Sequence, residues 1–256
     1  MMSLDILADR VDQAAANATA IAQLTDQVPG LTVEDAYAIQ ALSMRRRYAR
    51  GEARVGIKMG LTSRAKMQQV GVDEVIWGRL TDGMRLEEGG TLSKSRYVHP
   101  RAEPEIAFLL KKPLAGEVTA AEAMAAVEAI APAIEIIDSR YQDFKFTLPD
   151  VVADNSSSSG FIVGTWFAAD TPIDNLGILL EADGRTVQVG STAAILGHPV
   201  RSLVAAARMA GRAGEGLKAG DIVLAGGATA AHPLAVGMHV RAVFQTLGAV
   251  GISVTE

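Results

Sequence analysis

Three glutamates lie in apolar stretches of the sequence, and their type and spacing point to metal chemistry. Glu103 and Glu105 belong to RAEPEIAF (101–108), and Glu135 lies in APAIEIID (131–138). Alternate residues of a strand project from one face, so the first two carboxylates should point the same way. An unpaired ionised carboxylate inside an apolar sheet is costly, so we expect a positive group between these side chains.

A divalent cation is one such group. The four histidines are scattered without ligand spacing and the chain has no cysteine. Carboxylate oxygens remain, and they are the hard ligands that octahedral Mg²⁺ or Mn²⁺ prefers. The sequence therefore predicts a metal site formed by Glu103, Glu105 and Glu135. A second interpretation stays open, in which the first two face solvent on an edge strand and Glu135 pairs with an arginine such as Arg140.

Two other segments are candidates for the chemistry. Lys58 lies among apolar and glycine neighbours in GIKMG (56–60), where partial burial would lower its pKa and let it move protons near neutral pH. A lysine at a strand end can instead extend its amine to water. The serine-rich stretch DVVADNSSSSG (150–160) is either a polar binding loop or a flexible connector. We interpret the glycine pairs at 89–90 and 226–227 as turns.

Both helices and strands are needed to position these residues. Apolar spacing and capping residues, such as Thr32 with Asp35 three residues later, predict helices at 4–24, 32–50, 63–71, 119–131 and 198–211. Short apolar segments separated by turn residues predict strands within 54–62, 96–110, 132–140, 160–167, 176–191, 221–227 and 239–254. Asp183 and Gly184 predict a hairpin turn. We expect an α+β fold with a helical N-terminal part at 1–52 and a β-rich catalytic domain at 53–256.

Composition and charge limit the function classes. With 256 residues, 49% of them hydrophobic, the chain can bury the core of one large domain or one and a half, at ~100–200 residues per domain. A net charge of −5 with dispersed basic residues argues against a nucleic-acid or membrane partner. No apolar run approaches the ~20 residues that span a bilayer, and the N-terminus lacks a signal-peptide layout. The absence of cysteine fits a reducing compartment, so we expect a cytoplasmic protein.

Four blocks of the sequence together resemble a known family. They are GIKMGLTSRAKMQQVGVDEVIWGRLTDGM (56–84), HPRAEPEIAFLLKKPL (99–114), PAIEIIDSRYQDFKFTLPDVVADNSSSSGFIVG (132–164) and DIVLAGGATAA (221–231). The resemblance is to the hydratase/decarboxylase branch of the fumarylacetoacetate hydrolase superfamily, whose enzymes handle 2-oxo acids made by meta-cleavage of catechols. It covers the chain from about residue 30 to the end.

This resemblance implies a fold and a site. The fold is a β-rich mixed-sheet roll with an added helical N-terminal part. The three glutamates would hold Mg²⁺ or Mn²⁺, Lys58 would be the catalytic lysine of the G-x-K-x-G block, and Ser157 would contact the substrate. In the VIWG block (75–78), Ile76 precedes Trp77 at the position where some family members have an acidic residue. The resemblance therefore assigns no functional role to a residue of this block.

Two reactions of the branch compete. The stretches at 138–161 and 224–231 look more like enzymes that decarboxylate 2-oxo-3-hexenedioate, also called 4-oxalocrotonate, to 2-oxopent-4-enoate and CO₂. Hydration of 2-hydroxypenta-2,4-dienoate is the alternative. An alternative of another class is a non-catalytic partner subunit whose glutamates bind a structural ion.

The expected decarboxylation needs an acid and a group that binds the departing carboxylate. Lys58, or a water that it positions, would protonate C3 after CO₂ leaves. Arg140 and Lys145 are the candidates for the carboxylate. The resemblance also implies a homo-oligomer and an association with the hydratase of the same pathway.

Overall fold

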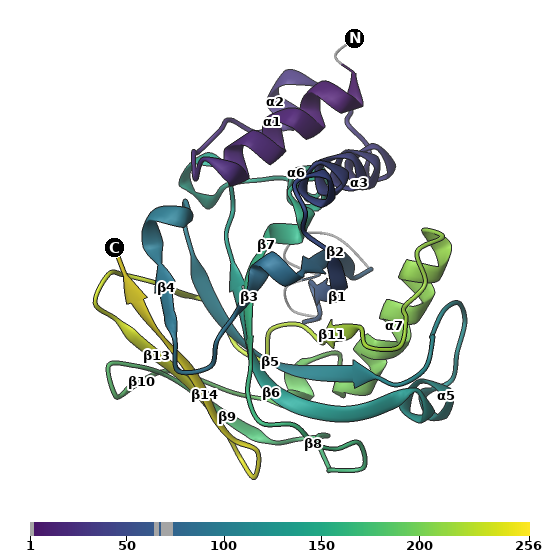
Figure 1. Cartoon of the computed structure of the whole chain (residues 1–256), viewed down its shortest axis with the longest axis vertical. Coiled ribbons are helices and arrows are strands. Elements are labelled where there is room, and N and C mark those ends of the chain that lie inside the picture. The colour runs from purple at the N-terminus through teal and green to yellow at the C-terminus, as the bar shows by residue number, and fades with distance from the viewer. Residues whose placement is uncertain (1–2, 64–66, 68–73) are drawn as a thin grey trace.

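The computed structural model describes residues 3–63, 67 and 74–256. Its helices are α1 (Leu4–Ala16), α2 (Leu24–Gln27), α3 (Val33–Ala49), α5 (Ala120–Ala125), α6 (Leu148–Ala153) and α7 (Pro199–Arg212). Helices α1, α2, α3 and α6 gather at one end of the molecule, and the strands form the other end (Figure 1). None of the described helices is long and apolar enough to cross a membrane.

The strands form two mixed sheets. They are β1 (Arg54–Gly60), β2 (Ile76–Thr81), β3 (Arg85–Leu86), β4 (Thr91–Ser93), β5 (Arg101–Leu110), β6 (Val127–Ile137), β7 (Ser158–Val163), β8 (Phe167–Ala168), β9 (Gly177–Ala182), β10 (Arg185–Ser191), β11 (Ile222–Leu224), β12 (His232–Pro233), β13 (His239–Phe244) and β14 (Gly248–Thr255). The larger sheet has the order β2-β1-β11-β5-β6-β7-β3, and the smaller one β10-β9-β13-β14-β4. This confirms the α+β, β-rich fold with helices at the N-terminus.

The core explains why β5 is apolar along most of its length. Ile106 and Phe108 project from one face into a cluster that also contains Leu180 of β9 and Ile252 of β14. Ala107 projects from the other face into a second cluster. Both faces of the strand are therefore buried, and any charged residue on it needs a specific partner.

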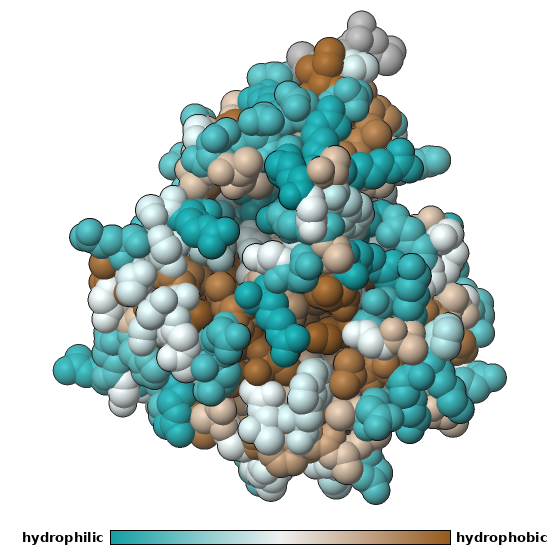
Figure 2. All heavy atoms as spheres, in the orientation of Figure 1, coloured by the Kyte–Doolittle hydropathy of each residue, from teal (hydrophilic) through white to brown (hydrophobic). Residues whose placement is uncertain are grey.

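The molecular surface is mixed. On the face drawn in Figure 2, exposed apolar residues lie mainly near the middle, between hydrophilic ones.

The N-terminal helices follow the sequence pattern only in part, and α2 was not predicted. The Thr32 side chain accepts from Asp35 N, and the Asp35 carboxylate accepts from Thr32 N, so the predicted capping box of α3 is confirmed. The first helix ends at Ala16 instead of residue 24. Asn17 Nδ2 donates to the Gln13 carbonyl at 2.9 Å, and Ala18 has φ 48°, so the chain leaves the helix there.

The helix predicted at 119–131 is wrong beyond residue 125. Its capping box of Thr119 and Glu122 is present, but β6 begins at Val127 and pairs with β5, with Ile130 opposite Phe108. The helix propensity of this alanine-rich stretch is overridden because β5 needs a partner along its whole length. The helix at 198–211 is confirmed as α7, and the hairpin is confirmed between β9 and β10. The helix predicted at 63–71 lies largely outside the described residues.

The helical part and the β-rich part share apolar contacts. Leu7 of α1 and Ile39 of α3 belong to one buried cluster with Tyr141 and with Val152 of α6. The division of the chain at residues 52 and 53 stays a prediction.

Candidate metal centre and active-site cavity

The three glutamates meet on one face of the larger sheet. Strands β5 and β6 are antiparallel, with Glu103 directly opposite Glu135, and Glu105 is two residues along β5 on the same face. One carboxylate oxygen of each lies within 4.8 Å of the others. Glu105 and Glu135 are fully buried and Glu103 is 8% exposed. Because β5 lies inside the sheet between β11 and β6, the solvent-facing interpretation is wrong.

This cluster has the properties of a site for a divalent cation. Burial, reinforced by the charge of Glu135, raises the pKa of Glu105 well above its usual range. Burial also raises the pKa of Glu135. Glu105 Oε1 and Glu135 Oε1 have no hydrogen-bond partner within the described residues. Buried carboxylate oxygens that lack donors and lie this close together match the ligand set of Mg²⁺ or Mn²⁺.

Lys58 reaches the cluster from β1. Its Nζ lies 3.0 Å from Glu135 Oε2 and donates to the Ser156 carbonyl at 2.9 Å. The cationic neighbour of Glu135 is therefore Lys58 and not Arg140. Burial would lower the pKa of Lys58, but the charges of Glu135, Glu105 and Glu103 outweigh it and the pKa is raised. The predicted lowering of the Lys58 pKa is therefore wrong. In the chain without a metal ion, the Lys58 amine is protonated and acts as a donor.

The serine-rich stretch is a buried and fixed loop. In the 3-10 turn η4 (Asn155–Ser157) all three residues have positive φ, from 49° to 61°. The Asn155 side chain accepts from Arg79 N and donates to Arg79 O, at 2.8 and 2.9 Å. Ser156 Oγ donates to the Trp77 carbonyl at 2.7 Å. The loop is not a flexible connector, and the buried Ser157 Oγ has no partner within the described residues.

Gly226 and Gly227 belong to the site, although the sequence indicated only a turn. Gly226 has φ 103° and its N–H donates to Glu105 Oε2 at 2.7 Å. A Cβ on Gly227 would lie 2.6 Å from Glu103 Oε2. The only signal in the sequence was a glycine pair directly after a buried strand, which ordinary turns share.

A cavity of about 360 Å³ is lined by Glu103 of the glutamate trio. Its lining also includes the polar residues Lys58 and Ser157 and the apolar residues Phe146 and Leu148. Such a mixture of apolar wall and few convergent polar groups is typical of a small-molecule site.

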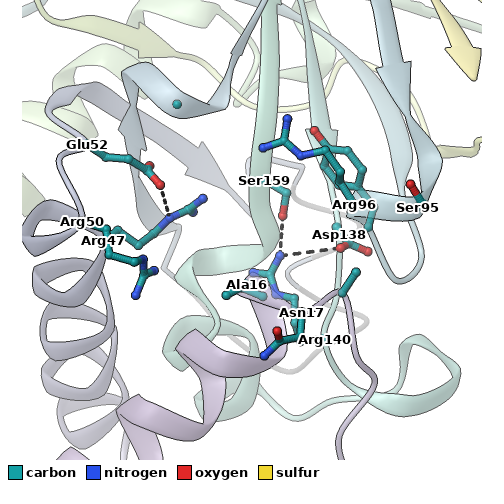
Figure 3. Close-up of a pocket in the computed structure, with 14 residues that line it drawn as sticks. Ala16, Asn17, Arg47, Arg50, Glu52, Ser95, Arg96, Asp138, Arg140 and Ser159 are labelled. Carbon is teal, nitrogen blue, oxygen red and sulfur yellow. Dashed lines mark hydrogen bonds and ion pairs between the residues drawn. The ribbon is translucent and has the colours of Figure 1, made fainter. Parts of the chain in front are cut away.

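Arg140 and Lys145 do not line this cavity. Arg140 lies in a separate cavity, where it contacts Asp138 and Ser159 (Figure 3). Its Nε also pairs with Asp154, and Lys145 is exposed. Arg101 does line the cavity, and it is not among the site residues predicted from the sequence.

Comparison with known proteins agrees with this geometry. Residues 79–255 match the family described as fumarylacetoacetate (FAA) hydrolase C-terminal. The chain belongs to the fumarylacetoacetate hydrolase family. It is 55% identical over 254 residues to a 4-oxalocrotonate decarboxylase of a Pseudomonas species, covering 99% of each chain.

More distant members of the fumarylacetoacetate hydrolase family include hydratases. A 2-hydroxyhexa-2,4-dienoate hydratase of Comamonas testosteroni is 36% identical over 252 residues, 96% of each chain. Among solved structures, 4-oxalocrotonate decarboxylase from Pseudomonas putida G7, complexed with magnesium and adipate, matches with a TM-score of 0.96 and 38% identity over 99% of each chain. These findings confirm the predicted family, branch and fold.

Proposed function

We propose that this protein is a metal-dependent lyase that decarboxylates 4-oxalocrotonate to 2-oxopent-4-enoate and CO₂, in the meta-cleavage breakdown of aromatic compounds. The observation that carries the proposal is the buried glutamate trio with Lys58 at 3.0 Å from Glu135, in a chain 55% identical to a 4-oxalocrotonate decarboxylase. Another candidate activity, hydration of a 2-hydroxydienoate, is that of a relative of lower identity.

Glu103, Glu105 and Glu135 would hold Mg²⁺ or Mn²⁺. The chemistry that such an ion supplies when bound is Lewis-acid polarisation of the 2-oxo group. The chain orients the ligands itself, because the Gly226 N–H fixes one oxygen of Glu105, while Oε1 has no donor among the described residues. The apolar side of the cavity limits the water that competes for the site.

Lys58 is the proposed acid. Cleavage of the C5–C6 bond releases CO₂ and leaves an electron pair that spreads through C5, C4 and C3 to the C2 oxygen. Formation of 2-oxopent-4-enoate then requires one proton at C3. Lys58 lines the cavity as a protonated amine held by the Ser156 carbonyl at 2.9 Å, so it supplies this proton directly or through a water.

Ser157 is proposed to contact the substrate, because its buried hydroxyl lines the cavity and has no partner within the described residues. Ser157→Ala should raise KM by about 2–10-fold, the effect of one neutral hydrogen bond, and leave thermal unfolding unchanged. Ser202→Ala is the matched control, because its buried Oγ also lacks a described partner but does not line the cavity. Equal KM values for Ser157→Ala and wild type would remove Ser157 from the substrate site.

One experiment separates the candidate functions. The purified chain with Mg²⁺ is given 4-oxalocrotonate or 2-hydroxypenta-2,4-dienoate, and CO₂ and hydroxy acid are measured in the same mixture. We expect CO₂ in proportion to the loss of the conjugated absorbance, and no hydroxy acid. Hydroxy acid without CO₂ would establish the hydratase. No reaction with either compound would favour a non-catalytic subunit with a structural ion.

We also propose a homo-oligomer that associates with the pathway hydratase in the cytoplasm, and a domain boundary near residue 52. The family resemblance and the absence of cysteine support these proposals. The molar mass in solution, alone and mixed with the hydratase, tests the two assemblies. Cell fractionation tests the compartment, and limited proteolysis tests the boundary.

A further inference from the structure

We propose that Arg101 binds the second carboxylate of the substrate, the one that leaves as CO₂, and so selects 2-oxo diacids over 2-oxo monoacids. The identity of the diacid rests on the proposed function. The selection itself rests on four features of the cavity.

The first feature is position on the strand. Arg101, Glu103 and Glu105 alternate along β5, so they share one face of the sheet. At ~3.4 Å per residue, Arg101 is about 7 Å from Glu103 along the strand. A six-carbon diacid with bonds of ~1.5 Å spans about 6 Å between its terminal carbons. A diacid with its 2-oxo end at the glutamates therefore brings its other end to the level of Arg101.

The second feature is a free guanidinium. Arg101 lies over the ring of Phe144, with 3.8 Å from Cζ to the ring centroid. Its side chain takes part in no hydrogen bond or ion pair of the described residues. Stacking on the ring occupies the flat face of the guanidinium and leaves the N–H groups at its edge available. These N–H groups can donate two parallel hydrogen bonds to the two oxygens of one carboxylate.

The third feature is the way Phe144 is held. Asp143 and Phe144 both have positive φ, 56° and 57°, in the 3-10 turn η3 (Gln142–Phe144). This backbone conformation is uncommon for residues other than glycine. In a residue with a bulky side chain, such as Phe144, it marks a position that the surrounding structure constrains. The ring packs against Phe146 at 5.5 Å and edge-on to His99 at 6.2 Å, between centroids. The turn thus fixes the platform on which Arg101 lies.

The fourth feature is charge. The charges of three carboxylates, Lys58 and one divalent cation sum to zero, so these groups together carry no surplus positive charge for a second carboxylate. Among the described residues that line the cavity, Lys58 and Arg101 are the only cations, and Lys58 is engaged by Glu135. The wall near Arg101 includes Ile137 and Phe144. A carboxylate left unpaired against such a wall would be costly.

The test compares two unreactive ligands, 2-oxoadipate and 2-oxohexanoate, which share the 2-oxo acid end and differ in the distal carboxylate. Their dissociation constants are measured by calorimetry with the Mg²⁺-loaded protein. We expect wild type to bind the diacid about 10–100-fold more tightly, the effect of a charge-assisted pair. Arg101→Met should bring the ratio near 1 by weakening the diacid alone, and Arg101→Lys should give an intermediate ratio. Lys145→Met, which removes an exposed charge next to Phe144, should behave as wild type.

Two results would overturn the inference. The first is a wild-type ratio in Arg101→Met, and the second is an equal weakening of both ligands, which would mark Arg101 as structural. Turnover does not enter this test. A chain that selects the diacid through Arg101 but releases no CO₂ would refute the proposed function and support the inference. A chain that decarboxylates normally with an unchanged ratio in Arg101→Met would refute the inference alone.

Discussion

Replacing Glu105 with glutamine should lower kcat/KM for 4-oxalocrotonate by about a thousandfold or more and leave the protein folded. The polarisation that a metal ion supplies amounts to several kcal/mol, and each 1.36 kcal/mol is about tenfold in rate. Glutamine can still accept from the Gly226 N–H, which donates to Glu105 Oε2 at 2.7 Å, but it brings no charge to the ion. Glu128→Gln, an exposed position on β6, is the control and should keep full activity.

The same variant should respond to metal differently from wild type. Without metal, wild type holds three buried carboxylates within 4.8 Å, and a neutral amide removes part of their repulsion. Glu105→Gln should therefore unfold at the same temperature as metal-free wild type or at a higher one. Added Mg²⁺ should raise the unfolding temperature of wild type. It should raise that of the variant much less, because Mg²⁺ stabilises the folded protein only to the extent that it binds. A variant with wild-type activity and Mg²⁺ stabilisation would exclude Glu105 as a ligand.

The raised pKa of Glu105 fixes the pH dependence of metal binding. Burial and the charge of Glu135 raise this pKa, so the metal-free site retains protons at a pH where free glutamate has lost them. Metal binds the deprotonated carboxylates and releases those protons. Affinity for Mg²⁺ should consequently rise with pH and fall toward acid. Calorimetry in buffers of different ionisation enthalpy measures the released protons, and Glu105→Gln should release fewer than wild type.

The site could be predicted from the sequence only where its geometry is local. Glu103 and Glu105 share a face because they are two residues apart on one strand, and this spacing is visible in the sequence. The same spacing places Arg101 on this face, but an arginine at a strand end resembles any surface arginine in the sequence. Arg140 and Lys145 flank the same region of the sequence, but Arg140 lines a separate cavity and Lys145 is exposed.

Contacts between distant segments could not be predicted. The position of Glu135 opposite Glu103 depends on the register of β5 with β6, and the start of β6 was concealed in a helix-favouring stretch. The raised pKa of Lys58 depends on three carboxylates brought together from two other strands. The role of Gly226 depends on where β11 ends beside β5. Each of these is a property of strand pairing and not of a short sequence window.

Replacing Lys58 with methionine should lower kcat by about 10²–10⁴-fold, the usual contribution of a positioned acid, in the presence of saturating Mg²⁺. Methionine keeps a long apolar side chain in a position that is 3% exposed but has no proton to give and no charge for Glu135. Because Mg²⁺ would still balance two of the three glutamate charges, the variant should bind metal and unfold at a temperature that rises with Mg²⁺. Steady-state rates and thermal unfolding with and without Mg²⁺ check both parts.

Lys58→Arg separates proton transfer from electrostatics. Arginine keeps the positive charge beside Glu135, which Lys58 contacts at 3.0 Å, but its guanidinium does not give up a proton in proteins because its pKa is above ~12. If Lys58 is the acid, the arginine variant should recover less than a tenth of the activity that methionine loses. Near-complete recovery would assign Lys58 to charge balance at the glutamates, and the proton at C3 would then come from another donor. A loss of activity in both Lys58→Met and Lys58→Arg, with metal binding intact, is the result expected if Lys58 is the acid.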